Sequence, residues 1–203
     1  MFTGIVQELG TVRAVARKGG LVHLRIQAPK TAETLQAGES VAVNGVCVTI
    51  VRVAQGCVEA DVIQETQHLT TLGTLVSGDR VNVERSLTLS DRLNGHLVLG
   101  HIDGIGRVLT RHERAGEITL EIRLDRTLGR YVVPKGPLTV DGVSLTVARR
   151  PTATRCAVCV IPETRHRTTL GFRRVGEAVN IEIDYVAKLI AQLHGYRDGN
   201  RTR

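Results

Sequence analysis

Cys47 is the side chain of this sequence best suited to act as a nucleophile. It lies in residues 43–49, VNGVCVT. A thiolate adds to an electron-poor ring carbon far more readily than a hydroxyl does. A small buried core residue is the commoner role of a lone cysteine in a strand. The sequence leaves both interpretations open.

Two histidines, His96 and His101, lie five residues apart in residues 95–101, GHLVLGH. On a strand, residues five apart face opposite sides of the sheet, so this pair could not chelate one metal ion without a bend. We expect proton transfer or hydrogen bonding from them. A purely structural role is the alternative for either one.

The remaining cysteines do not indicate a metal site. Cys156 and Cys159 have the spacing of a CxxC motif, but in a predicted strand their side chains would face opposite ways, and we expect both to be core residues. Cys47 and Cys57 form no second pair, so a four-cysteine zinc site fails on spacing. The sequence also contains no GxGxxG or GxxxxGK[ST] loop, which disfavours an ATP- or NAD-dependent enzyme. We therefore expect no metal and no cofactor.

The composition is that of an ordinary soluble domain with a basic surface. Its 203 residues carry a net charge of +7, but the basic residues are mixed with acidic ones except in residues 197–203. Aromatic residues make up only 2 %, so the stacking platforms of a single-strand binder are missing and we expect no nucleic-acid partner. No run approaches the ~18 apolar residues of a membrane span, and the start does not resemble a signal peptide. We expect no membrane association, a cytoplasmic location and reduced thiols.

The elements that must position these residues come as two copies of one unit. Residues 65–73 (ETQHLTTLG) recur as residues 163–171 (ETRHRTTLG), with seven of nine positions identical. Residues 43–49 match 140–146 (VDGVSLT), and residues 78–84 (GDRVNVE) match 176–182 (GEAVNIE). Matches in one order at nearly one offset indicate a duplication. We expect domains at residues 1–96 and 97–184, with a helix and basic tail at 185–203.

Each copy is predicted to be all-β. Short β-branched runs, separated by turn residues, favour a small barrel or sandwich. The expected strands are residues 21–26, 46–53, 57–63, 81–84, 118–124, 143–148, 155–161 and 179–183, with short helical turns at 30–35 and 125–131. The strands at 46 and 143 follow Asn-Gly and Asp-Gly turns, which are typical of hairpins.

Two similar barrels predict two similar binding sites. We expect a planar heterocycle to bind in each barrel mouth, against the strand after the hairpin turn and the following Glu-Thr segment. Thr66 and Thr164 could instead only cap the turns that follow them. Ser144 stands where the first copy has Cys47, and Arg167 where it has Leu69. This pattern is typical of a protein that holds one molecule in two different roles.

The last predicted element is a helix over residues 185–193. Val186, Leu189, Ile190 and Leu193 form one apolar stripe at helical spacing, with no equivalent between the repeats. The stripe favours a contact between subunits, with packing on the chain's own barrel as the alternative.

Taken together, the motifs resemble one known family. Residues 1–6 (MFTGIV), 43–49, Gly95-His96 with Gly100-His101, Lys135-Gly136, 141–146 (DGVSLT) and 161–164 (IPET) are similar to riboflavin synthases of the two-barrel, α-chain type and occur in the same order. The similarity runs from residue 1 to about residue 193.

The resemblance implies a fold, a reaction and an assembly. The fold is a pair of six-stranded Greek-key barrels, in a homotrimer whose C-terminal helices associate. The reaction, which needs no cofactor, is the dismutation of two 6,7-dimethyl-8-ribityllumazine molecules to riboflavin and 5-amino-6-ribitylamino-pyrimidinedione. The working site would form between the N-terminal barrel of one subunit and the C-terminal barrel of its neighbour. Association with lumazine synthase is a further implied partner.

The resemblance also implies site residues. The groups expected to assist the chemistry are Ser40, Cys47, His96, His101 and Ser144. The ligand of the first barrel would be surrounded by Gly4, Ile5, Val6, Cys47, Val48, Thr49, Asp61, Val62, Ile63, Gln64, Glu65 and Thr66. The ligand of the second barrel would be surrounded by Gly100, His101, Ile102, Lys135, Ser144, Leu145, Thr146, Val160, Ile161, Pro162, Glu163 and Thr164.

Two positions depart from the family pattern before the second barrel. Asn94 stands where a glycine is common, and Leu99 stands where a serine is common, which removes a hydroxyl beside the site. The rival interpretation is a lumazine- or flavin-binding antenna protein without turnover. Such relatives lose the cysteine and histidines, whereas Cys47, His96 and His101 are present here.

Overall fold

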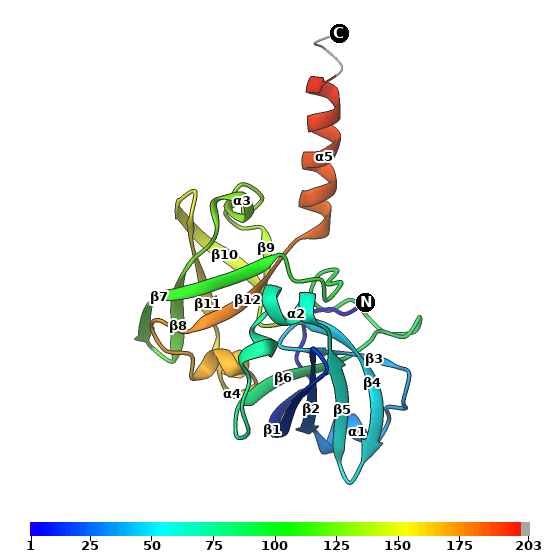
Figure 1. Cartoon of the computed structure of the whole chain (residues 1–203). Helices are drawn as coiled ribbons and strands as arrows, with labels where there is room; N and C mark the ends of the chain where they lie inside the picture. Colours follow the sequence, from blue (N-terminus) through cyan, green and yellow to red (C-terminus); the bar gives the residue numbers. More distant parts are fainter. Residues whose placement is uncertain (200–203) are drawn as a thin grey trace.

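The computed structural model describes residues 1–199 and shows two closed six-stranded barrels side by side, followed by a single helix (Figure 1). Residues 200–203, which end the expected basic tail, lie outside the described residues. All strand pairs within the barrels are antiparallel.

The first barrel closes in the order β1-β2-β5-β4-β3-β6. Its strands are β1 (Glu8–Lys18), β2 (Leu21–Gln27), β3 (Ser40–Val43), β4 (Val46–Ala54), β5 (Cys57–Val62) and β6 (Arg80–Arg85). Its short helices are α1 (Pro29–Ala32), α2 (Gln64–Leu69) and η1 (Thr71–Thr74). Because β2 pairs with β5 and the hairpins β3-β4-β5 lie beyond it, the connection is a Greek key.

The second barrel repeats this order as β7-β8-β11-β10-β9-β12. Its strands are β7 (Gly104–Arg114), β8 (Glu117–Arg123), β9 (Pro137–Val140), β10 (Val143–Thr152), β11 (Arg155–Val160) and β12 (Ala178–Ile183). Its helices are α3 (Arg126–Gly129), α4 (Pro162–Arg167) and η2 (Thr169–Gly171), and α5 (Tyr185–Gly199) follows. The predicted fold, two duplicated all-β barrels and a C-terminal helix, is confirmed.

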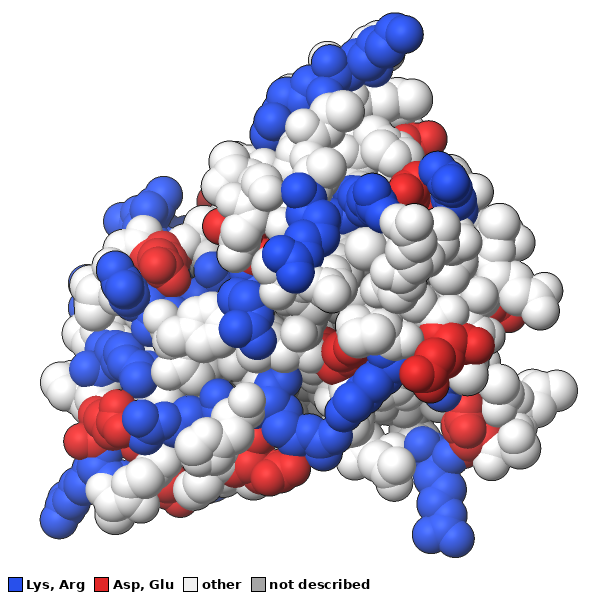
Figure 2. All heavy atoms as spheres, turned by 90° about the horizontal axis from the view of Figure 1, so that it is seen from below, with Lys and Arg blue, Asp and Glu red and all other residues white. Residues whose placement is uncertain are grey.

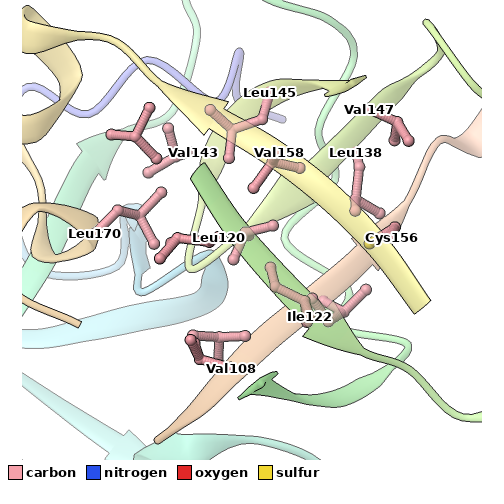
Figure 3. Close-up of a cluster of buried hydrophobic side chains, with 14 of the residues drawn as sticks. Val108, Leu120, Ile122, Leu138, Val143, Leu145, Val147, Cys156, Val158 and Leu170 are labelled. Carbon is pink, nitrogen blue, oxygen red and sulfur yellow. The ribbon is translucent and has the colours of Figure 1, made fainter. Parts of the chain in front are cut away.

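Alternating side chains fill each barrel. In the second barrel, aliphatic residues from the strands point toward one another between the walls, and Cys156 lies among them (Figure 3). A matching cluster fills the first barrel. Cys159 faces outward and is exposed, so the expectation that both CxxC cysteines are core residues is wrong for Cys159. All four cysteines are free.

The longest strands, β1 and β7, were not among the expected strands. Only two of the eleven positions of each are buried, so neither shows the regular alternation by which a strand is recognised. Each also changes register partway, at Val12/Ala14 and Val108/Thr110. Such bulges let a strand bend around a small barrel.

The two barrels meet back to back at their hairpin turns. Gly45 and Gly142 approach so closely that a Cβ on either would lie 2.6 Å from the other's backbone nitrogen. Around this contact the side-chain amides of Asn82 and Asn180 reach into the opposite barrel. Asn82 Oδ1 accepts from the Thr169 amide at 2.7 Å, and Asn180 Oδ1 accepts from the Thr71 amide at 2.8 Å. The paired bonds show that the duplicated units are related by an approximate two-fold axis.

Helix α5 points away from both barrels (Figure 1). Its apolar stripe is open, because Val186, Leu189, Ile190 and Leu193 are each at least two-fifths exposed. The alternative that this stripe packs on the chain's own barrels is therefore wrong. Within residues 1–199, no helix is long and apolar enough to cross a membrane.

Charged residues are mixed on the face seen in Figure 2, where Lys and Arg alternate with Asp and Glu. No single basic stripe covers that face.

Candidate active site

Residues 2–6 precede the first barrel and residues 96–102 precede the second, and each of these two crossing segments contacts the other barrel. Phe2 and Val98 form an antiparallel bridge between the two segments, and the His96 amide donates to the Thr3 carbonyl at 3.2 Å. The Ser144 amide of the second barrel donates to the Gly4 carbonyl at 2.7 Å, and the Cys47 amide of the first barrel donates to the Gly100 carbonyl at 2.9 Å. Each segment therefore lies against the strand that follows the hairpin turn of the opposite barrel.

This exchange corrects the predicted grouping of site residues. Gly4, Ile5 and Val6 were expected at the first-barrel site, but Val6 belongs to the core of the second barrel. The segment of Gly100, His101 and Ile102 was expected at the second-barrel site, but Ile102 packs on the core of the first. Each segment therefore lies beside a candidate site, but the segment of Gly4 lies beside the second barrel and the segment of Gly100 beside the first.

Glycine is required where each segment touches its strand. Gly4 and Gly100 have φ angles of +75° and +80°, and a Cβ on either would lie 2.6 Å from the Cβ of Ser144 or Cys47. A side chain at these positions would meet both backbone strain and a clash. The two glycines therefore let a main-chain carbonyl reach the strand amide.

The polar side chains predicted for the two sites lie on the outer wall of each barrel, whereas the sequence predicted a site in the barrel mouth. Cys47 and Thr49 face outward and alternate with buried Val46, Val48 and Ile50. Ser144 and Thr146 alternate in the same way in β10. A six-stranded barrel has room inside only for its own side chains. The predicted residues Val48, Val62, Leu145 and Val160 point into these cores, so only their backbone could face a ligand.

Ser144 and His96 form the most organised polar group at either site. His96 Nδ1 lies 2.7 Å from Ser144 Oγ, and its Nε2 lies 3.1 Å from Thr139 Oγ1 on β9. Burial lowers the pKa of His96, against a smaller opposing effect of the Asp184 carboxylate. The imidazole is thus held neutral near pH 7, with one nitrogen free to accept a proton.

Cys47 has a different environment. Its side chain packs with Phe2, Ala42 and Val98 in a small apolar cluster. In residues 1–199, no hydrogen bond to its Sγ is present. Ser40 lies on the same face of the ladder, because β3 pairs Ser40 with Thr49 and Ala42 with Cys47. His101 follows Gly100 and is exposed.

A cavity of about 170 Å³ gathers residues predicted for both sites. It is lined by Gly4, Ile5, Val6, Val143, Ser144, Glu163, Thr164, Arg167 and Thr168. Three of these, Val143, Arg167 and Thr168, were not predicted as site residues. Arg167 could have been found, because it is one of the two changes in the otherwise repeated 65–73 segment. Its guanidinium lies 3.2 Å from Glu163 Oε1.

The Glu-Thr segments form the short helices α2 and α4. Thr66 and Thr164 lie inside α2 and α4, so the alternative that they cap the following turn is wrong. The caps are Thr70 and Thr168, whose hydroxyls accept from the amides of Leu72 and Leu170. The same hydroxyls donate to the carbonyls of Thr66 and Thr164 at 2.6 and 2.7 Å.

The other predicted residues lie around these centres. On the outer face of β5, Asp61 Oδ1 lies 2.7 Å from His23 Nδ1. Ile63 and Ile161 are half-exposed at the starts of α2 and α4. Lys135 is exposed, with its amide donating to the Val147 carbonyl at 2.8 Å. The structure therefore does not bring Lys135 into the Ser144 cavity.

Two buried glutamates that the sequence did not single out hold the crossing segments. Glu84 accepts from the amides of Thr3 and Gly4, at 2.7 and 3.1 Å. Glu182 accepts from the amides of Leu99 and Gly100, at 2.7 and 3.0 Å. A signal was available, because these residues end the repeated segments 78–84 and 176–182.

Comparisons with known proteins agree with this architecture. The sequence matches the lumazine binding domain family twice, over residues 3–86 and 99–184. It is 43 % identical over 196 residues to riboflavin synthase of Mycobacterium bovis, covering 95 % of this chain and 98 % of that protein. It is 34 % identical over 203 residues to riboflavin synthase of Bacillus subtilis, covering 100 % and 94 %. The chain belongs to the riboflavin synthase family.

Among solved structures, this riboflavin synthase family member is similar to LumP in complex with two ligands. A crystal structure of LumP complexed with riboflavin has a TM-score of 0.83 and 26 % identity, covering 90 % of this chain and 99 % of that one. LumP complexed with 6,7-dimethyl-8-(1'-D-ribityl) lumazine has a TM-score of 0.81 at 24 % identity, which shows the shared fold. Both family matches begin in a crossing segment, at Thr3 and Leu99.

Proposed function

We propose that this chain converts two molecules of 6,7-dimethyl-8-ribityllumazine into riboflavin and 5-amino-6-ribitylamino-pyrimidinedione. The observation that carries the proposal is a site built twice, in a riboflavin synthase family member, with different reactive side chains. Two copies of one compound must play two roles in this dismutation. A duplicated scaffold with Cys47 in one copy and Ser144 in the other suits that requirement.

The reaction moves four carbons from one substrate molecule to the other. The donor loses ring carbons C6 and C7 with their methyl groups and leaves as the pyrimidinedione, and the acceptor becomes riboflavin. The C7 methyl group is unusually acidic because the ring delocalises the carbanion, so a modest base is enough to begin. Holding two rings in register could supply about 7–11 kcal/mol of the barrier.

We assign the second-barrel chemistry to Ser144 and His96. With its proton on Nε2, neutral His96 accepts the Ser144 proton at Nδ1, and the alkoxide-like oxygen can then add to the electron-poor C7 of a donor. Water held by the same pair is the alternative nucleophile. Cys47 and His101, with Ser40 on the neighbouring strand, are the polar groups assigned to the first-barrel site.

The small size of the second-barrel cavity supports a site shared between subunits. About 170 Å³ is well below the roughly 300–1,000 Å³ of most small-molecule sites, so a second surface is needed to enclose the substrate.

The exposed apolar stripe of α5 supports a homotrimer through that helix. Sedimentation should show smaller species for Leu189→Asp, whereas Gln192→Asp, a polar change on the same helix, should sediment like the parent. An unchanged assembly in Leu189→Asp would contradict the role of the helix.

Location and further partners stay predictions. Four free cysteines suit a reducing compartment, which supports a cytoplasmic location. Association with lumazine synthase is expected from the family resemblance, and co-sedimentation of the two purified proteins would test it.

The activity is tested by incubating the protein with 6,7-dimethyl-8-ribityllumazine and EDTA while following riboflavin absorbance. One riboflavin for every two lumazines consumed is the expected result. Tight binding without riboflavin would contradict the proposal and indicate a binding protein of the LumP kind.

A further inference from the structure

The Glu182 carboxylate and the Cys47 amide both hydrogen-bond to the backbone of residues 99–100. The Glu182 carboxylate is buried at the end of β12, where it accepts from the Leu99 and Gly100 amides. The carbonyl of Gly100 accepts from the Cys47 amide at 2.9 Å. The position of the Gly100 carbonyl over the first-barrel site therefore depends on the carboxylate behind it.

The first half of the chain contains the same arrangement with one more hydrogen bond. Glu84 accepts from the Thr3 and Gly4 amides and also from the Thr3 hydroxyl, at 2.9 Å. Leu99 is the equivalent of Thr3 and has no hydroxyl. Glu182 is thus as deeply buried as Glu84 but has two donors from its crossing segment instead of three.

The charges around Glu182 do not replace the missing donor. Asp103 before β7 and Lys188 on α5 face it, but they bond to each other at 3.0 Å. Glu182 of β12 lies opposite Thr139 of β9, whose hydroxyl is within hydrogen-bond distance of His96 Nε2. Asp184 is the acidic residue close to that His96 side chain. Burial raises the pKa of Glu182 to about 7, with Asp103 adding to that effect and the amides and Lys188 opposing it. Burial also raises the pKa of Glu84, and the Thr3 amide and hydroxyl and the Gly4 amide oppose that rise.

We propose that Glu182 is a positioning residue that holds the Gly100 carbonyl against the Cys47 amide only in its charged form, and that Leu99 makes this hold sensitive to pH. The proposal rests on the function proposed above for its effect on turnover. A protonated carboxyl loses acceptor strength toward two amides at once, which loosens the segment. Turnover should therefore fall as the pH drops through about 7.

Leu99→Thr is the decisive variant, because it restores the donor that Thr3 supplies to Glu84. Its acid limb in kcat should move about one pH unit lower, which is the effect of one hydrogen bond to a charged group. Glu182→Gln should remove the limb near pH 7, leave the limb of His96 at lower pH, and lower kcat on the order of tenfold at pH 8, with a smaller change in KM. A Leu99→Thr profile that superimposes on the parent would overturn the proposal, whether or not Glu182→Gln folds.

A second readout needs no substrate and separates this proposal from the proposed function. Amide hydrogen exchange of Cys47 should show protection that falls below pH 7 in the parent and persists in Leu99→Thr. The Ser144 amide, which bonds to Gly4 under Glu84, is the internal control and should acquire the same pH dependence in Thr3→Val. Protection of Cys47 that does not change with pH would overturn the positioning role. The expected exchange pattern without riboflavin formation would contradict only the function.

Discussion

Cys47 and Ser144 make the same backbone hydrogen bond but have different side-chain neighbours. Ser144 has a neutral imidazole at 2.7 Å, whereas Cys47 has an apolar cluster beside it. The sequence identified both residues and both histidines. It could not show that His96 reaches Ser144, 48 residues away, because that contact depends on how the crossing segment packs.

His96→Gln tests the hydrogen-bonded pair of Ser144 and His96. Gln can still hydrogen-bond Ser144 but cannot accept its proton, so kcat should fall about 100-fold with little change in ligand affinity. His112→Gln, an exposed change on β7, is the control and should behave like the parent. Equal kcat in the two variants would remove His96 from the chemistry.

Cys47→Ser tests the first-barrel site at the same scale. A hydroxyl is a much weaker nucleophile than a thiolate, so turnover should fall more than about tenfold while ligand binding holds. Steady-state kinetics and ligand fluorescence measure the two quantities. Unchanged turnover would assign Cys47 to packing alone.

At the scale of elements, the duplication and most strands could be predicted, but the exchange of segments could not. The two copies are so alike that the sequence pattern around Gly4 would be the same whether Gly4 contacted the first barrel or the second. The family resemblance implied the first barrel for Gly4, whereas the structure places Gly4 against Ser144 of the second. Glu84 and Glu182 end the repeated segments 78–84 and 176–182, but their role could not be predicted, because their partners are backbone amides, which residue types do not identify.

Gly4→Ala tests whether the crossing segment shapes the second-barrel site. A Cβ there would meet Ser144 and force a strained backbone, so turnover should fall more than about tenfold and stability by about 1–3 kcal/mol. Gly19→Ala is the matched control, because Gly19 also has a positive φ but faces open space. It should lose about 1 kcal/mol of stability and no activity. Equal activity in both variants would contradict the assignment.

At the scale of the whole molecule, the two-fold contact between barrels contains one charged departure. Asp141, fully buried, pairs with Arg173 at 2.8 Å, whereas the first copy has Asn44 and Leu75 at these positions. Burial raises the pKa of Asp141, and Arg173 opposes that rise. One copy of the interface thus contains an ion pair and the other a neutral amide.

Arg173→Leu should destabilise the protein by about 3–5 kcal/mol, because it leaves a buried carboxylate unpaired. The double variant with Asp141→Asn reproduces the first copy and should recover much of that loss. Denaturant unfolding measures both. A double variant no more stable than Arg173→Leu would show that the two copies are not interchangeable here.

We propose that one chain holds two sites of the same design, one on each barrel. Equilibrium titration with riboflavin, followed by quenching of flavin fluorescence, counts those sites directly. We predict two equivalents bound per chain, with different affinities because Cys47 and Ser144 differ in their surroundings. One equivalent per chain would contradict the claim.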